Sequence, residues 1–262
     1  MLIHNFDPVA IDLNFLQIRW YSLAYIFGIL IGWFYGRKII SKLRVYNNFS
    51  YLKIDDFDDL IPYLIIGIII GGRIGYVFLY NLEYYINNLL EIFYIWEGGM
   101  SFHGALVGIV FSTILFCNKK KIQKLVYFDI ISCVTPIGLF LGRISNFING
   151  ELYGKKTELP WGVVFPKIDN LTRHPSQIYE ALMEGLILFV ILNFLAFKKK
   201  VIFSSGTTSM LFVFLYSLFR ILIEFYREPD YQLGYIIYSF SMGQVLSVLM
   251  IFFSILVYLK IK

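Results

Sequence analysis

Seven runs of apolar residues, each close to the length that crosses a lipid bilayer, constrain the fold of this chain more than any other feature. They lie at about 21–40, 60–80, 102–118, 127–144, 176–197, 207–226 and 240–259. A helix needs about 20 consecutive apolar residues to span the hydrocarbon core. Only 16% of the residues are charged, too few to cover a soluble fold. The sequence therefore predicts an all-α, polytopic membrane protein of about seven transmembrane helices, with residues 1–262 forming one integral membrane domain.

The charges between these runs alternate along the chain. Basic clusters such as Lys119–Lys121 and Lys198–Lys200 follow the odd-numbered runs, and Lys262 ends the chain. The other connections carry Glu83 and Glu91, or form a mixed loop at about 145–175. Because cytoplasmic loops are enriched in lysine and arginine, we expect the N-terminus outside and the C-terminus in the cytoplasm. The loop at about 145–175 then forms a small extracytoplasmic cap.

The composition also argues against two classes of site. The net charge of +5 arises from short basic runs beside the apolar segments, so nucleic-acid binding is not expected. Cys117 and Cys133 lie within apolar runs without a CxxC spacing or neighbouring histidines. We therefore expect both thiols to pack as small hydrophobic groups, and neither a metal site nor a cofactor is expected.

Polar residues occur inside the runs, where a central charge costs about 2.5–3.5 kcal/mol on insertion scales. All lie in the outer halves or at the outer ends of the runs: Tyr21, Arg73, His103, Arg143, His174, Glu180, Arg220 and Glu224. Since several helices direct polar groups to one outward-facing level, we expect a functional site there.

Each of these residues also has a purely structural interpretation. An arginine near a helix end can extend to the lipid headgroups, and Arg220 with Glu224 can neutralise each other at a spacing of four. His174 is expected to hydrogen-bond or cap the fifth helix rather than to react. Asp129 is expected to be a charge near the N-terminus of the fourth helix.

The chemistry of the remaining candidates suits a phosphate group. A guanidinium group stays charged and donates two parallel hydrogen bonds to a phosphate, so Arg73 and Arg143 favour a phospholipid headgroup. Gly98 and Gly99 precede His103 and allow the chain to turn back into the membrane. His103 is then a candidate general base.

Two other functional classes remain open. A transporter or channel also carries charges within the membrane, but its polar groups usually extend through the full depth, whereas here they gather on one side. A structural membrane scaffold would tolerate replacement of Arg143 and Arg220.

Five segments of the chain resemble the prolipoprotein diacylglyceryl transferase family. Residues 142–154 read GRISNFINGELYG, and the resemblance extends to GGRIGY at 71–76, GGMSFHG at 98–104, RHPSQIYE at 173–180 and RILIEFYREPD at 220–230. The segments occur in the expected order over almost the whole chain. Two departures are visible: Ser145 replaces the usual glycine or alanine, and the loop after Gly154 is short.

The resemblance implies transfer of an sn-1,2-diacylglyceryl group from phosphatidylglycerol to the lipobox cysteine of a prolipoprotein signal peptide. Glycerol phosphate is released in this first step of bacterial lipoprotein maturation. The implied place is the bacterial plasma (inner) membrane, with the active site toward the outer leaflet and membrane lipids as partners.

The resemblance also implies roles for nine residues. Arg143 would bind the phosphatidylglycerol headgroup, Arg220 the leaving phosphate, and His103 would activate the thiol. The others would orient the site, with Arg73 and Glu224 pairing within the arginine network: Tyr21, Arg73, Asn146, Glu151, Gly154 and Glu224.

Single-cysteine labelling tests the orientation. In a background with Cys117 and Cys133 replaced by alanine, Glu83→Cys is expected to react with an impermeant thiol reagent added outside intact cells. Lys121→Cys is expected to react only after the inner face is exposed. Labelling of Lys121→Cys from outside would overturn the orientation.

Overall fold

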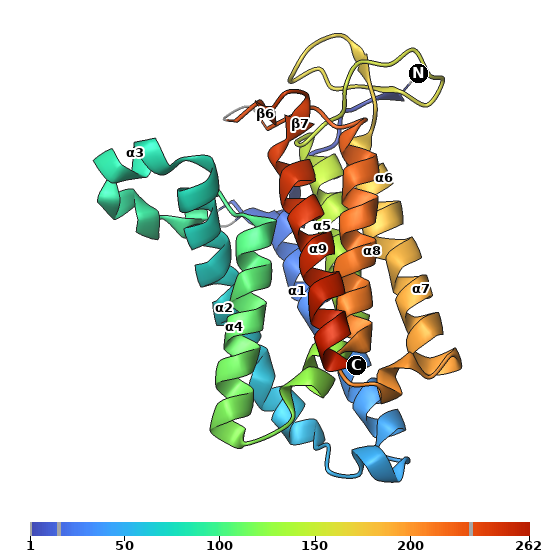
Figure 1. The fold of residues 1–262 in the computed structure, drawn as a ribbon. Coiled ribbons are helices and arrows are strands. Elements are labelled where there is room, and N and C mark those ends of the chain that lie inside the picture. Colours follow the sequence, from blue (N-terminus) through green and yellow to red (C-terminus); the bar gives the residue numbers. More distant parts are fainter. Residues whose placement is uncertain (1, 15–16, 231–232) are drawn as a thin grey trace.

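The computed structural model describes residues 2–14, 17–230 and 233–262. Within these ranges, seven helical segments are long and apolar enough to cross a membrane. They are α1 (Trp20–Leu43), α2 (Ile54–Tyr80), α4 (Phe102–Lys120), α5 (Lys124–Asn149), the segment Ser176–Lys198, α8 (Thr207–Glu224) and α9 (Met242–Ile261). The prediction of an all-α membrane protein with about seven spans is therefore confirmed (Figure 1).

The helix boundaries differ from the apolar runs most at the start of the second span and at the end of the fourth, where α5 continues to Asn149 instead of ending near residue 144. The second span was expected from about residue 60, but α2 begins at Ile54 and includes Pro62. Asp55 and Asp56 occupy its first turn, where negative charge is favourable because the N–H groups of that turn point outward. Pro136 does not interrupt α5, which runs unbroken from Lys124 to Asn149.

The span Ser176–Lys198 has an irregular backbone. It consists of α6 (Ser176–Glu180), the π-helical segment η4 (Ala181–Ile187), α7 (Leu188–Asn193) and a second π-helical segment η5 (Phe194–Lys198). A π-turn adds one residue per turn and re-aims the side chains around it. In this span Gly185 lies against Phe140 of α5, where an added Cβ would collide with the Phe140 backbone.

Short elements gather at one end of the bundle, the upper end in Figure 1. β1 (Leu2–Ile3) pairs in parallel with β4 (Val163–Val164), which pairs in antiparallel with β5 (Thr172–Arg173). Two hairpins lie there as well, β2 (Val9–Asp12) with β3 (Gln17–Arg19), and β6 (Tyr235–Ile237) with β7 (Phe240–Ser241). His4 follows β1, and its Nε2 lies 2.6 Å from the carbonyl oxygen of Phe147, which fastens the N-terminal segment to α5.

An arm projects sideways from the top of α2 (Figure 1). It contains α3 (Leu82–Asn87) and the 3-10 segments η2 (Leu89–Phe93) and η3 (Ile95–Glu97). The opposite end of the bundle holds two further 3-10 segments, η1 (Asn47–Phe49) and η6 (Val201–Phe203), in the connections after α1 and η5.

Glycines set the close contact between α2 and α4. Gly67, Gly71 and Gly75 on α2 face Gly104 and Gly108 on α4, and a Cβ on any of them would collide with the backbone of the other helix. Small residues at a spacing of four let membrane helices approach until their backbones touch. This contact fixes the first turn of α4, where His103 immediately precedes Gly104.

The main apolar core lies toward the other end of the bundle. It includes Ile40 and Leu43 of α1, Leu60 of α2 and Ile130 of α5. Cys117 and Cys133 are buried free thiols within this core, as the apolar surroundings in the sequence predict.

Asp129 has a different partner from the one expected. It lies in the second turn of α5, where its carboxylate accepts hydrogen bonds from the backbone N–H groups of Gly206 and Ser209, at 2.6 and 2.7 Å. These N–H groups belong to the start of α8, which has no side-chain cap from its own N-cap residue Gly206. Asp129 therefore stabilises the N-terminus of α8 and not that of its own helix.

Replacement of Asp129 by alanine tests this role. The change leaves two buried N–H groups without an acceptor, so we expect the free energy of unfolding to fall by about 2 kcal/mol or more. Thermal unfolding of the purified protein in detergent measures the loss. The exposed Asp55→Ala serves as the control and is expected to unfold close to the wild-type temperature. Equal melting temperatures for Asp129→Ala and Asp55→Ala would contradict the capping role.

Candidate active site

Four charged side chains from three spans form a closed ring of ion pairs toward the end of the bundle that carries the short strands, and all but Arg143 are buried. Arg143 of α5 lies 3.0 Å from Glu180 and 3.3 Å from Glu184. Arg220 of α8 lies 2.7 Å from Glu180 and 3.5 Å from Glu184. Each guanidinium group therefore contacts both carboxylates, and each carboxylate contacts both guanidinium groups. The two glutamates lie on α6 and η4 at a spacing of four, so they lie one turn apart on one side of the span.

The ring extends toward the start of α9. Arg220 also pairs with Glu224 on the next turn of α8, and Glu224 accepts a hydrogen bond from Ser241 Oγ at 2.7 Å. Arg227 lies 3.0 Å from Glu224 and 2.6 Å from Asp230. Ser241 in turn caps α9 by accepting from the backbone N–H of Gln244. One polar network thus connects α5, the fifth span, α8 and the N-terminus of α9.

His103 faces this network from α4. It lies within the range of electrostatic interaction with Arg220, Glu224 and Arg143. Both ring nitrogens are buried, and neither has a hydrogen-bond partner among the residues that the structure describes. The imidazole is therefore positioned by packing, including an edge-on contact with Phe102.

The segment after α5 is folded tightly around Glu151. Asn146 donates a 2.6 Å hydrogen bond from Nδ2 to Glu151 Oε1, and Gln177 donates to the carbonyl oxygen of the same glutamate. Tyr21 of α1 lies within electrostatic range of Glu151 and Arg143, and its hydroxyl lies 3.2 Å from that of Tyr25. Tyr21 and Asn146 therefore lie on the side of Arg143 that faces the segment after α5.

Gly154 lies where two other backbone segments meet. Its N–H donates to the carbonyl oxygen of His174 at 3.0 Å, and it forms a β-bridge with Arg227. An added Cβ would lie within 2.7 Å of the carbonyl oxygens of His174 and Tyr226. Glycine at this position allows the loop to pass between the backbone that precedes the fifth span and the backbone that follows α8.

Arg73 is not part of the ring, which corrects the expectation that it pairs within the arginine network. Its guanidinium group donates to the carbonyl oxygens of Glu91, Ile92 and Gly98 at 2.6, 2.9 and 2.6 Å. It also lies over the ring of Tyr85. The short helical turns of the arm leave carbonyl groups without intrahelical partners, and Arg73 satisfies them. Arg73 and Arg143 thus have different partners although their flanking sequences look alike.

Of the two structural alternatives expected for His174, a hydrogen bond or a cap on the fifth span, the structure shows the hydrogen bond. The N-cap residue of α6 is Pro175, and no side chain caps this end. His174 Nδ1 lies 3.2 Å from the hydroxyl of Tyr179, and burial lowers the pKa of His174 below its ordinary value. The neutral form of the imidazole is therefore favoured beside the two tyrosines Tyr179 and Tyr226.

A second ion pair holds the loop between α5 and the fifth span. Arg173 pairs with Asp169 at 2.6 Å and with Glu228 at 3.3 Å, and donates to the carbonyl oxygen of Gly154. The hydrogen bond from Arg173 lowers the pKa of Asp169 and raises that of Arg173. The loop is thereby joined to the segment after α8.

Sequence reasoning missed Glu184 as a site residue and did not assign a role to Arg227. Glu184 is completely buried in the middle of an apolar span, and its charge there was the available signal. It follows Glu180 by four residues, so both fall on one helix face. Their pairing with arginines of two other helices depends on the fold.

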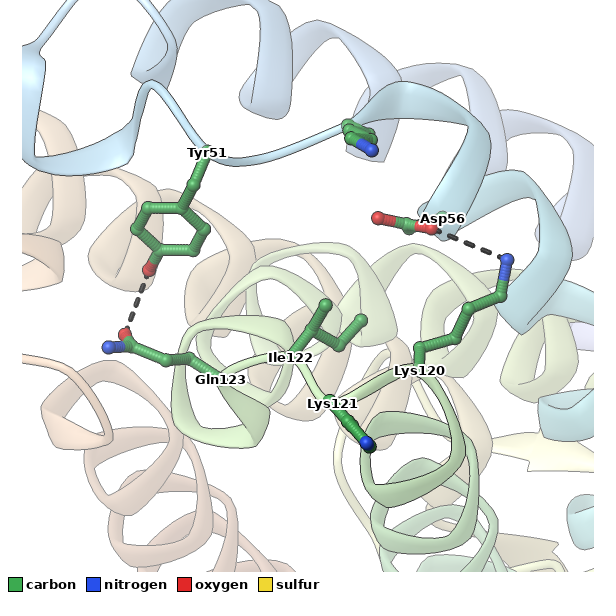
Figure 2. Close-up of a pocket in the computed structure, with 7 residues that line it drawn as sticks. Tyr51, Asp56, Lys120, Lys121, Ile122 and Gln123 are labelled. Atoms are coloured by element: carbon green, nitrogen blue, oxygen red, sulfur yellow. Dashed lines mark hydrogen bonds and ion pairs between the residues drawn. The ribbon is translucent and has the colours of Figure 1, made fainter.

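A cavity of about 580 Å³ lies at the opposite end of the bundle (Figure 2). It is lined by residues of the connection between α4 and α5 and of the start of α2, including Lys120, which pairs with Asp56 at 3.5 Å. Tyr51 donates to Gln123 Oε1 at 2.8 Å across it. Since α4 rises about 1.5 Å per residue, most of its length separates this cavity from His103, so the cavity is not part of the arginine ring.

Comparison with known proteins identifies the family. The family model described as prolipoprotein diacylglyceryl transferase matches residues 8–260. A Rickettsia felis protein named phosphatidylglycerol–prolipoprotein diacylglyceryl transferase is 49% identical over 251 residues, 96% of this chain and 95% of that protein. A Rickettsia typhi protein of the same name is 51% identical over 247 residues, covering 94% of this chain and 93% of that protein. The chain therefore belongs to the prolipoprotein diacylglyceryl transferase family.

Proposed function

We propose that this membrane transferase moves the sn-1,2-diacylglyceryl group of phosphatidylglycerol to the thiol of the lipobox cysteine in a prolipoprotein signal peptide. The products are a thioether and glycerol phosphate, and the reaction is the first step of bacterial lipoprotein maturation. Membership of the family and the names of its bacterial relatives support this reaction. The observation that carries it in the structure is the pair of arginines Arg143 and Arg220, which share the buried carboxylates of Glu180 and Glu184.

The chemistry needs a nucleophile and a stabilised leaving group. The cysteine sulfur attacks the sn-3 carbon of the glycerol backbone, and the bond from that carbon to the phosphate oxygen breaks. The departing phosphate monoester gains negative charge, which preorganised guanidinium groups stabilise. Arg143 binds the headgroup of phosphatidylglycerol, and Arg220 stabilises the leaving phosphate.

His103 takes the proton of the attacking thiol. An unperturbed thiol has a pKa of about 8.5 and is mostly protonated at neutral pH, so a nearby base raises the fraction of thiolate. Neither ring nitrogen of His103 has a hydrogen-bond partner among the described residues, which supports this role. Cys117 and Cys133 lie in the core at the other end of the bundle, so the nucleophile belongs to the substrate.

The remaining candidates shape the site around these three residues. The phosphatidylglycerol headgroup bound by Arg143 is oriented by Tyr21, Asn146 and Glu151. Gly154 permits the tight loop beside them. Glu224 holds Arg220 in place by direct pairing. Arg73 acts at a distance, by fixing the arm from which the chain enters α4.

The proposed location is the bacterial plasma (inner) membrane. The N-terminus and the arginine ring face the outer leaflet, where membrane lipids and the translocated signal peptide meet, and the C-terminus is cytoplasmic. The chain acts as a single integral membrane domain, with the loop at about 145–175 as its small cap. The alternating charges of the connections support this arrangement.

Replacement of Arg143 tests the headgroup assignment. Arg143→Ala removes charge-assisted hydrogen bonds worth about 1.5–3 kcal/mol each, so we expect transfer to a lipobox peptide to fall by about tenfold to a hundredfold or more. Arg143→Lys keeps the charge without the planar fork and is expected to fall between the alanine variant and the wild type.

The controls are equal membrane insertion and the variant Arg19→Ala, which removes an exposed arginine at the same end of the bundle. Arg19→Ala is expected to retain wild-type transfer. If Arg143→Ala modifies the peptide at the wild-type rate across phosphatidylglycerol concentrations, Arg143 is not a headgroup ligand.

The pH dependence of a His103→Gln variant tests the base. General-base catalysis contributes about 10²–10⁴-fold, so we expect a loss of that order at pH 7. The loss should shrink as the pH approaches 9, because the peptide thiol then ionises without help. Steady-state rates from pH 6 to 9 measure this. A loss of less than about tenfold at pH 7, with a pH profile parallel to the wild type, would assign thiol activation to the arginines alone.

A further inference from the structure

The arginine ring carries as much negative as positive charge. Among the described residues, the guanidinium groups of Arg143 and Arg220 are paired with the carboxylates of Glu180 and Glu184. Beyond the ring, Glu224 pairs with Arg220 and Arg227, and Arg227 also pairs with Asp230. All three glutamates have side chains that are at most 1% exposed. A phosphate that enters this site therefore does not meet unpaired guanidinium groups. It binds arginines that remain paired with buried carboxylates.

Access to the ring is greatest at Arg143. Its side chain is 13% exposed, against 7% for Arg220. The contact between Arg143 Nη1 and Glu180 Oε2 at 3.0 Å lacks the geometry of a hydrogen bond, so the hydrogens of Nη1 remain available. A guanidinium group has five N–H donors, which allows Arg143 to hold a phosphate while it stays paired with the glutamates.

The two glutamates differ in what they hold. Glu180 makes the shorter contacts with Arg143 and Arg220, and it also lies 3.6 Å from Arg227. Glu184 contacts only Arg143 and Arg220 among the described residues, at 3.3 and 3.5 Å. Glu180 therefore contributes most to the positions of the arginine side chains, while the charge of Glu184 still acts on Arg143 and Arg220.

The reaction creates a problem that this charge solves. The substrate phosphate is a diester with one negative charge. The product is a monoester, whose second ionisation has a pKa of about 6, so that it carries about −1.5 to −2 at pH 7. Two uncompensated arginines would bind the product more tightly than the substrate and would retain it. A buried carboxylate beside them opposes the additional charge.

We propose that Glu184 is a positioning residue that weakens the hold of Arg143 and Arg220 on the dianionic product and thereby promotes its release. This inference rests on the proposed function. Because the carboxylate acts through the arginines, its removal affects the affinity for phosphate in the opposite direction from the loss of a structural support.

The variant Glu184→Gln removes the charge and keeps the size of the side chain. We expect its inhibition constant for glycerol phosphate to fall about tenfold, with lower KM for phosphatidylglycerol and lower kcat, since product release becomes slower. Glu184→Asp retains the negative charge and is expected to restore an inhibition constant near that of the wild type. Glu158→Gln makes the same chemical change at an exposed loop position on the same end of the bundle, and is expected to change none of these constants.

The result that overturns the proposal is an inhibition constant for glycerol phosphate that is unchanged or higher in Glu184→Gln, with a raised KM. That pattern means that Glu184 only holds the arginines in place.

A measurement on the wild-type protein keeps the proposal testable if the variant does not fold. Calorimetric titration compares glycerol phosphate with the soluble diester glycerophosphoglycerol. We expect the diester to bind at least as tightly as the monoester. Tighter binding of the monoester by tenfold or more, or binding of neither anion, contradicts the proposal. Failure of the proposed function is distinguished separately, because the wild type would then not modify a lipobox peptide in phosphatidylglycerol vesicles.

Discussion

The structure depends on the rule that a charge buried in a membrane protein must be compensated where it lies. Arg143 and Arg220 enter the bundle from two helices, and Glu180 and Glu184 enter from a third. An unpaired charge is costly in an apolar span. The pairing of these four side chains therefore fixes how the three helices are positioned along one another. Glu224, Arg227 and Ser241 extend the same requirement to the segment after α8 and the cap of α9. A π-helical segment begins directly after Glu180, at the point where the span meets the arginines.

This compensation produces a site with oriented donors and little net charge. We propose that such a site binds a phosphodiester through hydrogen bonds more than through a strong field, which suits an enzyme that must also release a more highly charged product. His103 lies on α4, whose position is fixed by glycine contacts with α2. Arg73 contributes from outside the ring by holding the arm that leads into α4. The proposed phosphate ligands, the proposed base and the arm that precedes α4 are thus each held by a different set of contacts.

The sequence predicted the seven spans because apolar length is a local property of the chain. It also predicted that Arg143, Arg220 and Glu224 lie in one site, because charged side chains at the same depth of apolar spans have few partners other than one another. It could not predict partners that depend on helix packing. Arg73 and Arg143 share similar flanking residues, yet one binds backbone carbonyls and the other carboxylates. Asp129 accepts a hydrogen bond from Gly206, 77 residues later, at the N-terminus of α8, and Glu184 contacts arginines 41 and 36 residues away. Such distant pairings have no local signal. The roles assigned to the site residues remain predictions.

In the proposed reaction, sulfur attacks carbon while the arginines stabilise a departing phosphate. Phosphatidylglycerol labelled with ¹⁸O at the oxygen between the sn-3 carbon and phosphorus tests it directly, with the purified protein, a lipobox peptide and mass spectrometry of all products. We expect the label to leave entirely with glycerol phosphate and the peptide to gain an unlabelled diacylglyceryl group on sulfur. Label retained in diacylglycerol, with phosphoglycerol attached to the peptide, would show attack at phosphorus and would rule out the proposed reaction.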